Sequence, residues 1–397
     1  MNFRKFLALL VVLLTVFGLI GIVNARVEAD RVDRSESDER VIAHTDEEIS
    51  RAVYFGCKVV REAKTLKAFH CPRGVASLLS LAEDVRVFAL DDEAVDVLKG
   101  PQLIATSVSA NQQIGADIVH SNGNTGSGRK VIVLDTGYNY LHPELSSSYG
   151  GGWDFVNNDN DPMDDQGHGS HVSGIITADG VDPKAKGVAP DAGIIAGKVL
   201  DQKGSGYFSD VVAAIYWAVN GPDGIYGNSD DFGADAINLS LGTSKVYKGF
   251  CNGVLPDLTN AIKYAIDKNV TVVVAAGNSG SAGVSIPGCI SYSTTVGAVD
   301  STDKVARFSG KGKALDITAP GVSIYSTVLG SGYASWSGTS MATPMISGVV
   351  ALVKYAHPTY SQITVENKLF STAKDLGSTG KDTSYGWGRV RANLAVQ

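Results

Sequence analysis

The chain has 397 residues, of which 44% are hydrophobic and 19% are charged, a balance typical of globular proteins. This length allows one large domain and a smaller one. A formal net charge of −7 argues against a nucleic-acid partner, and such acidity suits solubility and bound cations better.

The N-terminus has the pattern of a secretory signal. Arg4 and Lys5 precede an apolar run over residues 6–23, and Val23 and Ala25 supply small residues for cleavage after Ala25. The alternative is a membrane anchor, because the run is close to the length that spans a bilayer. We expect a signal peptide over 1–25 and a secreted, extracellular protein without membrane attachment after its removal.

Residues 26–40 are charged with few apolar anchors and predict a solvated linker. Residues 41–97 predict a small α+β domain: a strand at 41–43, a helix opened by the capping box Thr45–Glu48, a hairpin, a helix through 75–81 and a closing strand at 85–90. This β-α-β-β-α-β order is the ferredoxin-like pattern.

The four cysteines agree with export. Cys57 and Cys71 are placed symmetrically about the expected hairpin turn, so they can face each other at disulfide distance. Cys251 and Cys289 flank the helix and strand that lead to Asn278, and a bridge there would staple that region. Four free buried thiols, which need a reducing compartment, are the alternative.

From residue 131 onward, predicted strands and helices alternate. Near-continuous Val and Ile runs predict strands that are buried on both faces. The expected strands are 131–134, 194–199, 236–239, 270–275, 294–299 and 315–318, and the expected helices are 169–178, 209–220, 257–268 and 340–356. The predicted architecture is an α/β fold with a doubly wound, mostly parallel sheet.

Three polar residues stand where acyl-transfer chemistry needs them. Asp135 ends an apolar strand before a Gly turn, His168 lies in a Gly-His-Gly-Ser-His run, and Ser340 opens a predicted buried helix. A helix start next to Ser340 would favour the negative charge that develops in acyl transfer. A Ser at such a start can also be a simple N-cap.

The chain order Asp135, His168, Ser340 is that of the subtilisin triad. The sequence resembles the subtilisin-like serine proteases over about residues 99–397. The similar stretches are Val133-Leu134-Asp135-Thr136-Gly137, His168-Gly169-Ser170-His171-Val172-Ser173-Gly174, Ala275-Ala276-Gly277-Asn278, Gly338-Thr339-Ser340-Met341-Ala342-Thr343-Pro344 and Tyr385-Gly386-Trp387-Gly388.

The resemblance implies that Ser340 is the nucleophile, His168 the base, Asp135 its orienting acid and Asn278 an oxyanion donor. Two other interpretations fit less well. Asp135-Thr136-Gly137 is also the aspartic protease tripeptide, but the second copy that such enzymes need is missing. His168 and His171 could bind a metal, but no His-Glu-x-x-His motif is present.

The resemblance also assigns the substrate-binding residues. A peptide substrate would add as a strand beside Ser240-Leu241-Gly242. Ala275-Ala276-Gly277 would line the primary specificity pocket, and Ser285 would replace a frequent Gly at its base. A Ser there predicts a shallower, slightly more polar pocket that still accepts large apolar side chains.

In this family the small N-terminal domain is a propeptide that assists folding and then inhibits. We therefore expect a propeptide within 26–98, self-cleavage between Leu98 and Lys99, and a catalytic domain over 99–397. The predicted function is that of a monomeric, secreted serine endopeptidase that acts on protein or peptide substrates. The alternative is a catalytically silent binding protein with the same fold.

Structural calcium (Ca²⁺) is the expected cofactor. The loop after residue 153 places oxygen ligands at alternating positions and resembles a calcium loop of thermophilic subtilases. The expected ligands are Asp154, Asn157, Asp159, Asp161 and Met163. A solvated acidic loop is the alternative. Residues 223–231 are a second candidate, and a commoner family site near Glu144 is expected to be lost because Val181 replaces a usual Asn.

Overall fold

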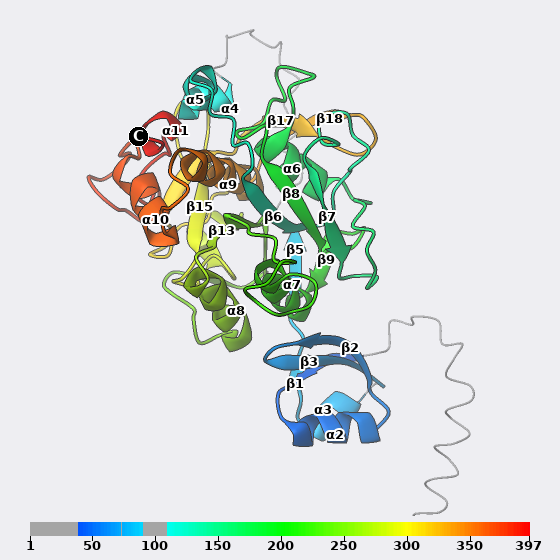
Figure 1. Ribbon diagram of the computed structural model, residues 1–397. Helices are drawn as coiled ribbons and strands as arrows, with labels where there is room; N and C mark the ends of the chain where they lie inside the picture. Colours follow the sequence, from blue (N-terminus) through cyan, green and yellow to red (C-terminus); the bar gives the residue numbers. More distant parts are fainter. Residues whose placement is uncertain (1–38, 73, 90–108) are drawn as a thin grey trace, which may run out of the picture. The chain divides into compact units, whose positions relative to one another are not determined.

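A computed structural model describes residues 39–72, 74–89 and 109–397 (Figure 1). The described residues form two compact units. The smaller one runs to Val60 and resumes at Ala68–Glu83, and the larger one comprises Arg61–Lys67 and Asp84–Gln397. The signal segment 1–25, the linker before residue 39 and the expected cleavage site between Leu98 and Lys99 lie outside the described residues.

The N-terminal elements follow the predicted β-α-β-β-α-β order, with a four-stranded sheet ordered β2-β3-β1-β4. Thr45 and Glu48 form the predicted capping box at the first helix. Cys57 and Cys71 are joined by a disulfide, with 4.2 Å between their Cα atoms. The elements are β1 (Glu39–Ala43), α2 (Asp46–Tyr54), β2 (Lys58–Ala63), β3 (Leu66–Cys71), α3 (Val75–Leu79) and β4 (Ala82–Glu83).

The closing strand of this sheet differs from the prediction for residues 85–90. The sheet closes with β4 at Ala82–Glu83, whereas β5 (Arg86–Ala89) belongs to the larger unit and pairs there with β9 (Ser205–Tyr207) and β11 (Leu241–Gly242). A strand run carries no information about which sheet it extends, because any open edge offers the same N–H and C=O groups.

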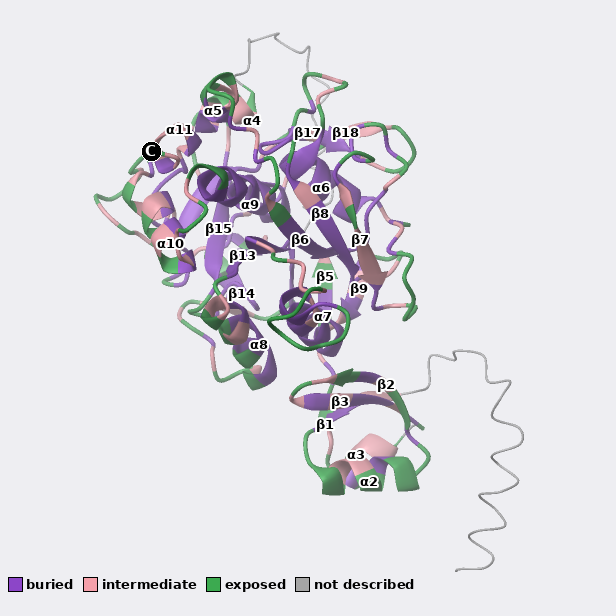
Figure 2. Ribbon diagram, viewed as in Figure 1, coloured by how far each residue is buried: buried purple, intermediate pink, exposed green. Residues whose placement is uncertain are grey.

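The larger unit is built on a seven-stranded sheet ordered β16-β15-β13-β10-β6-β8-β7, in which every pair of neighbours is parallel. Six of its strands were predicted, and most of their residues are buried (Figure 2), as the continuous Val and Ile runs indicated. The edge strand β7 was not predicted, because its Gly-rich sequence has no apolar run and most of its residues are only partly buried. The strands are β6 (Lys130–Asp135), β7 (Tyr149–Asp154), β8 (Gly193–Lys198), β10 (Ala236–Leu239), β13 (Thr271–Ala275), β15 (Thr294–Val299) and β16 (Ile317–Pro320).

Two pairs of helices flank this sheet. Helix α6 (His168–Thr177) packs against α9 (Thr339–Ala356), and α7 (Phe208–Asn220) packs against α8 (Pro256–Asp267). Helix α9 is buried over nearly its whole length, from Thr339 to Lys354, and packs on β10, β13 and β15. The predicted doubly wound α/β fold is therefore confirmed.

Further elements complete the unit, and all of them except β5 were absent from the prediction. Apart from the ten-residue α10, they are short strands and helices. Besides β5, β9 and β11, they are α4 (Ala110–Ile114), α5 (Ala116–Ser121), β12 (Val246–Tyr247), the 3₁₀ helix Gly280–Ala282, β14 (Val284–Ser285), β17 (Ile324–Thr327), β18 (Tyr333–Trp336), α10 (Gln362–Ser371) and α11 (Ala392–Ala395).

The strand order reverses between β6 and β10. From β6 the chain proceeds through β7 and β8 on one side, and from β10 it proceeds through β13, β15 and β16 on the other. Ligands of open α/β sheets bind in the crevice beyond the strand ends at such a switch point. Asp135 ends β6 and Ser240 directly follows β10, so the fold brings both to this crevice.

Candidate active site

The centre of the site is a buried hydrogen bond between the end of β6 and the start of α6. His168 Nδ1 lies 2.7 Å from Asp135 Oδ1, and both side chains are fully buried. Asp135 Oδ1 also accepts the backbone N–H of Thr136 at 2.7 Å. An imidazole whose Nδ1 faces a fixed carboxylate keeps its Nε2 as the proton-accepting nitrogen.

This contact requires a close approach of two backbone segments. A Cβ atom on Gly169 would lie 2.1 Å from the carbonyl oxygen of Gly137, so no larger residue fits there. Gly137 itself has a φ of +126° and faces the backbone of Asp164. The glycines that flank Asp135 and His168 are therefore needed to bring these two side chains together.

Asp164 holds the two segments in this position. Its Oδ1 accepts Thr136 Oγ1 at 2.9 Å and Gly167 N at 2.9 Å, and its Oδ2 accepts the backbone N–H and the hydroxyl of Ser170. Thr136 Oγ1 in turn accepts Gly169 N at 2.8 Å. Burial raises the pKa of Asp164, but the bonds from Ser170, Gly167 and Gln166 outweigh it and lower that pKa.

Sequence reasoning missed Asp164. The available signal was a carboxylate four residues before His168, at the start of a predicted helix, where an acidic side chain can cap backbone N–H groups.

Ser340 is the second residue of α9 and is fully buried. Its Oγ donates to the carbonyl oxygen of Ser240 at 3.0 Å, and Ser240 Oγ donates to the carbonyl oxygen of Ser340 at the same distance. These reciprocal bonds hold the start of α9 against the residue that follows β10. The positive end of a long helix thus lies at the Ser340 hydroxyl.

Asn278 follows β13 and is held by Thr339. Its side-chain Oδ1 accepts both Thr339 N at 3.0 Å and Thr339 Oγ1 at 2.9 Å. Thr339 Oγ1 also accepts the N–H of Gly277 at 3.1 Å. These two bonds fix the orientation of the Asn278 side-chain amide. Sequence reasoning did not single out Thr339, which fixes this orientation.

Strand β5 of the same unit is the middle strand of a three-stranded sheet, between β9 and β11. In β5, Phe88 pairs with Gly242 and Ala89 pairs with Leu241, both antiparallel. On its other edge, Val87 pairs with Gly206 of β9. The two short strands thus offer backbone groups on both sides of one extended segment, and β9 is a second pairing edge that the sequence did not reveal.

The residues assigned to the specificity pocket also come together. Ser285 N donates to Ala276 O at 3.0 Å. Ser285 Oγ lies so close to Gly277 that a Cβ there would be 2.6 Å from it, and Gly277 has a φ of +91°. Ala275, Ala276 and Ser285 are all buried. Ser285 Oγ has no hydrogen-bond partner among the described residues.

The acidic loop after β7 uses its carboxylates on its own backbone. Asp154 Oδ1 accepts the N–H groups of Val156 and Asn157, and its Oδ2 accepts Asn157 Nδ2 at 2.8 Å. Asp159 Oδ1 accepts Asp161 N. Asp161 Oδ1 accepts Met163 N.

No group of three or more His, Cys, Asp or Glu in the described part of the chain could hold a metal ion. The expected ligands therefore fit calcium only in part, since carboxylates that accept N–H groups are turned toward the backbone.

The Glu144 carboxylate also accepts backbone N–H groups of a neighbouring loop. Glu144 is fully buried and its carboxylate accepts the N–H groups of Gly180, Val181 and Asp182 at 2.6–3.0 Å. It also accepts the hydroxyl of Tyr333 at 2.9 Å. These donors occupy the carboxylate that a family calcium site would use.

Comparison with known proteins identifies the family. A profile of the Subtilase family matches residues 126–388, which is more than half of the chain. The chain belongs to the subtilase family. The match covers the whole seven-stranded sheet and all of the residues placed above at the crevice.

Relatives align over most of the chain. An "Alkaline protease" of Alkalihalobacillus alcalophilus is 35% identical over 380 residues, 96% of this chain and 91% of the relative. "Subtilisin E" of Bacillus subtilis (strain 168) is 36% identical and covers 86% of this chain and 84% of the relative. "Subtilisin Savinase" of Lederbergia lenta is 40% identical over 72% of this chain and 97% of the relative.

This subtilase is a serine endopeptidase, as its relatives and the family profile show. The alternative of a catalytically silent binding protein gains no support from them. Within the residues that the structure describes, no helix is long and apolar enough to cross a membrane.

His171 lies one turn along α6 from His168 and is not available for chemistry. It is fully buried, its ring stacks on Trp336 at a centroid distance of 4.5 Å, and its Nε2 lies 3.1 Å from Ala334 O. Burial lowers the pKa of His171 to about 3. The His171 ring therefore stays neutral in the folded protein above about pH 3.

This burial predicts acid sensitivity. Below about pH 6.5 the unfolded chain protonates His171 but the folded one does not until about pH 3, so stability from this residue falls as pH falls through that window. We expect His171→Gln to flatten the decline of Tm between pH 6.5 and 3 in thermal unfolding of the Ser340→Ala protein. His357→Gln, a partly exposed control, should keep the wild-type slope. Equal slopes for all three would contradict the prediction.

Proposed function

We propose that the endopeptidase works through Asp135, His168 and Ser340 as its triad, with Asn278 in the oxyanion hole. The observation that carries the proposal is the buried 2.7 Å contact between Asp135 and His168 at the crevice where Ser340 opens α9. Acyl transfer requires that these three groups meet in one place. We infer that they meet where the ends of the strands and the starts of the helices come together.

In this mechanism His168 Nε2 takes the proton of Ser340 Oγ as that oxygen attacks the substrate carbonyl. Asp135 holds the ring orientation and stabilises the imidazolium that forms. The oxyanion receives the side-chain amide of Asn278 and the N–H of Ser340. Removal of a side-chain donor of this kind costs about 3 kcal/mol of transition-state stabilisation. His168 then returns the proton to the leaving amine, and water releases the acyl group by the reverse steps.

Substrate binding is proposed to use strand addition. A peptide would take the position between β9 and β11 that β5 occupies, with its backbone paired to Leu241 and Gly242. The side chain before the scissile bond would enter the pocket lined by Ala275, Ala276, Gly277 and Ser285. Occupation of this position by the chain's own Arg86–Ala89 supports the second part of the proposal, that the N-terminal region inhibits the enzyme before it is removed.

Processing completes the proposed scheme. We assign 1–25 to a secretory signal peptide, 26–98 to the linker and propeptide, and 99–397 to a monomeric extracellular catalytic domain. The support is the signal pattern of residues 4–25, the separate small unit and the disulfides, which suit an oxidising compartment.

Ser340→Ala should abolish peptide hydrolysis and leave the precursor uncut, because one hydroxyl performs both reactions. The measurement is precursor size on a denaturing gel after expression in a protease-deficient host, together with a casein assay. Ser146→Ala, an exposed serine outside the site, is the matched control and should mature normally. Maturation of the Ser340→Ala chain under these conditions would show that the nucleophile is assigned wrongly.

The mature protein should begin at Lys99. Residues 94–98 form an apolar tail in sequence whose last side chain, Leu98, suits the proposed pocket, and the proline at 101 would help the new N-terminus separate. N-terminal sequencing of the secreted enzyme measures this directly. A start at Asp91 would instead mean that β5 itself delivers the scissile bond, and a start at Ile104 or later would exclude both.

Calcium binding is the most detailed part of the proposal, and it rests on the composition of loop 154–163. If Asp159 and Asp161 hold a calcium ion, free calcium at a hundredfold excess over its dissociation constant should stabilise the folded state by about 2.7 kcal/mol. Wild-type Tm should then fall in chelator, and Asp159→Ala should lose that response, while Asp267→Ala, an exposed carboxylate at the end of α8 and outside both acidic loops, keeps it. An unchanged wild-type Tm would assign the loop carboxylates to backbone capping alone.

A further inference from the structure

The second disulfide lies at the wall of the specificity pocket. Cys251 and Cys289 are bonded, with 5.4 Å between their Cα atoms, and both are buried. Cys289 ends a short turn that begins at Ser285, because Cys289 N donates to Ser285 O at 2.9 Å. The bridge is therefore one turn away from the residue assigned to the pocket base.

The partner segment wraps around this turn. Thr243 N donates to Ile286 O at 3.0 Å, β12 pairs with β14 so that Val246 lies opposite Ser285, and Cys251 N donates to Cys289 O at 2.9 Å. Residues 243–251 thus border the turn 285–289 at its first two residues and at its last. The disulfide is the covalent member of this set of contacts.

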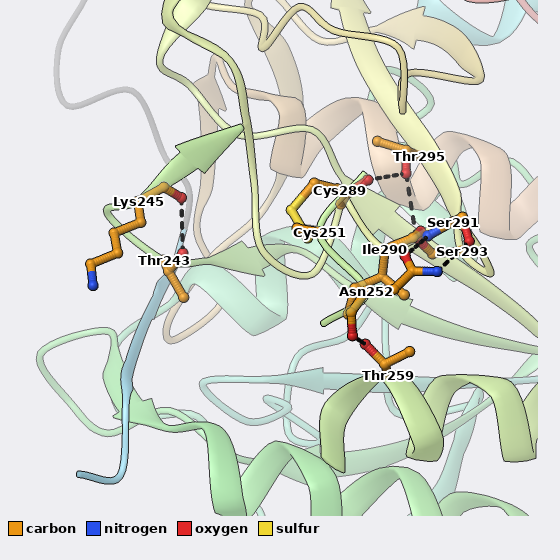
Figure 3. Close-up of a disulfide and its surroundings, with 11 residues drawn as sticks. Thr243, Lys245, Cys251, Asn252, Thr259, Cys289, Ile290, Ser291, Ser293 and Thr295 are labelled. Carbon is orange, nitrogen blue, oxygen red and sulfur yellow. Dashed lines mark hydrogen bonds between the residues drawn. A yellow bond between two sulfur atoms is a disulfide. The ribbon is translucent and has the colours of Figure 1, made fainter. Parts of the chain in front are cut away.

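The bridge connects the turn to rigid elements (Figure 3). Next to it, Asn252 Nδ2 donates to Ser291 Oγ at 2.8 Å and Asn252 Oδ1 accepts Ser291 N at 2.9 Å. Thr259 of α8 donates to Asn252 O at 2.9 Å. From the sheet, Thr295 of β15 donates to Gly288 O at 2.6 Å. The turn is fixed between α8 on one side and β15 on the other.

The loop that carries Cys251 has little packing of its own. Phe250 and Val254 are 57% and 44% exposed. A loop with few buried apolar contacts opens easily unless something else restrains it. At the pocket, Ser285 N donates to Ala276 O, and a Cβ on Gly277 would lie 2.6 Å from Ser285 Oγ. A small shift of the turn therefore changes the depth of the pocket.

We propose that the Cys251–Cys289 bridge is a positioning device for the primary specificity pocket. It holds the turn 285–289 so that Ser285 closes the pocket at a fixed depth, and thereby sets which side chain is accepted before the scissile bond. The inference rests on the proposed pocket of this endopeptidase, and it assigns to the bridge a role in substrate selection besides its contribution to stability.

The test uses the mature enzyme with Cys251→Ala and Cys289→Ala combined. KM and kcat are measured well below Tm with peptides that differ only in having Ala, Leu or Phe before the scissile bond. We expect the ratio of kcat/KM for Leu or Phe to that for Ala to shrink about tenfold. This is about the discrimination that one methylene group provides in a hydrophobic pocket. The change should lie mainly in KM, and labelling of Ser340 by phenylmethylsulfonyl fluoride should persist.

Two further variants separate positioning from stability. Val365→Ala removes buried volume from α10, outside the pocket, and should lower Tm without changing the preference. Asn252→Ala keeps the disulfide but removes both bonds to Ser291, and should shift the preference in the same direction by a smaller factor. It also carries the test should the double variant fail to fold.

An unchanged preference in the folded variants, with a lowered Tm, would overturn the positioning role and leave the bridge a stabilising link. Wild-type enzyme that neither cleaves these peptides nor labels at Ser340 would instead overturn the proposed function on which the pocket rests. The two failures are thus distinguishable, since labelling of Ser340 reports on the nucleophile irrespective of the residue that fills the pocket.

Discussion

The structure depends on one close approach, between the turn that ends β6 and the start of α6. The Asp135–His168 bond of 2.7 Å exists because Gly137 and Gly169 let two backbones come closer than any side chain allows. Such an approach leaves several N–H groups buried, and each must find an acceptor. Asp164 supplies these acceptors, so the geometry of Asp135 and His168 is a consequence of how the surrounding backbone is satisfied.

Buried carboxylates hold other loops of this enzyme in the same way. Glu144 accepts three consecutive N–H groups from residues 180–182 together with the hydroxyl of Tyr333, whose pKa is raised to about 12 by burial and by that carboxylate. Asp154 accepts two N–H groups of the loop after β7. Hydrogen bonds to a charged acceptor are the strong ones, so one acidic residue can fix a whole turn. Acidic composition in these loops therefore signals backbone capping at least as readily as a bound cation.

The sequence predicted six of the seven strands of the central sheet, its main helices and the order of Asp135, His168 and Ser340, because these depend on long apolar runs and short local motifs. It missed the edge strand β7, whose Tyr-Gly-Gly-Gly-Trp-Asp sequence has no apolar run. It did not predict β9, β11, β12 or β14, since two- and three-residue strands have no period that a pattern can reveal. The prediction of the sheet to which Arg86–Ala89 belongs was wrong for a related reason. A sequence can show that a segment forms a strand, but not with which strand it pairs. Asp164, Thr339 and the contact of Cys289 with the pocket turn become visible only when residues distant in sequence share one space.

Catalytic geometry and substrate selection are built from different parts of this fold. Helix α9 packs on β10, β13 and β15, and its first turn bonds to Ser240 and Asn278, the residues that follow two of these strands closely. The positions of the nucleophile and of the oxyanion donor are thus set by the core. The pocket wall, in contrast, is a turn between a loop and a strand, with exposed neighbours and no helix of its own. A rigid core can hold the catalytic residues in place while the pocket turn changes. A covalent bridge is a suitable restraint for this turn, because packing alone would leave it mobile.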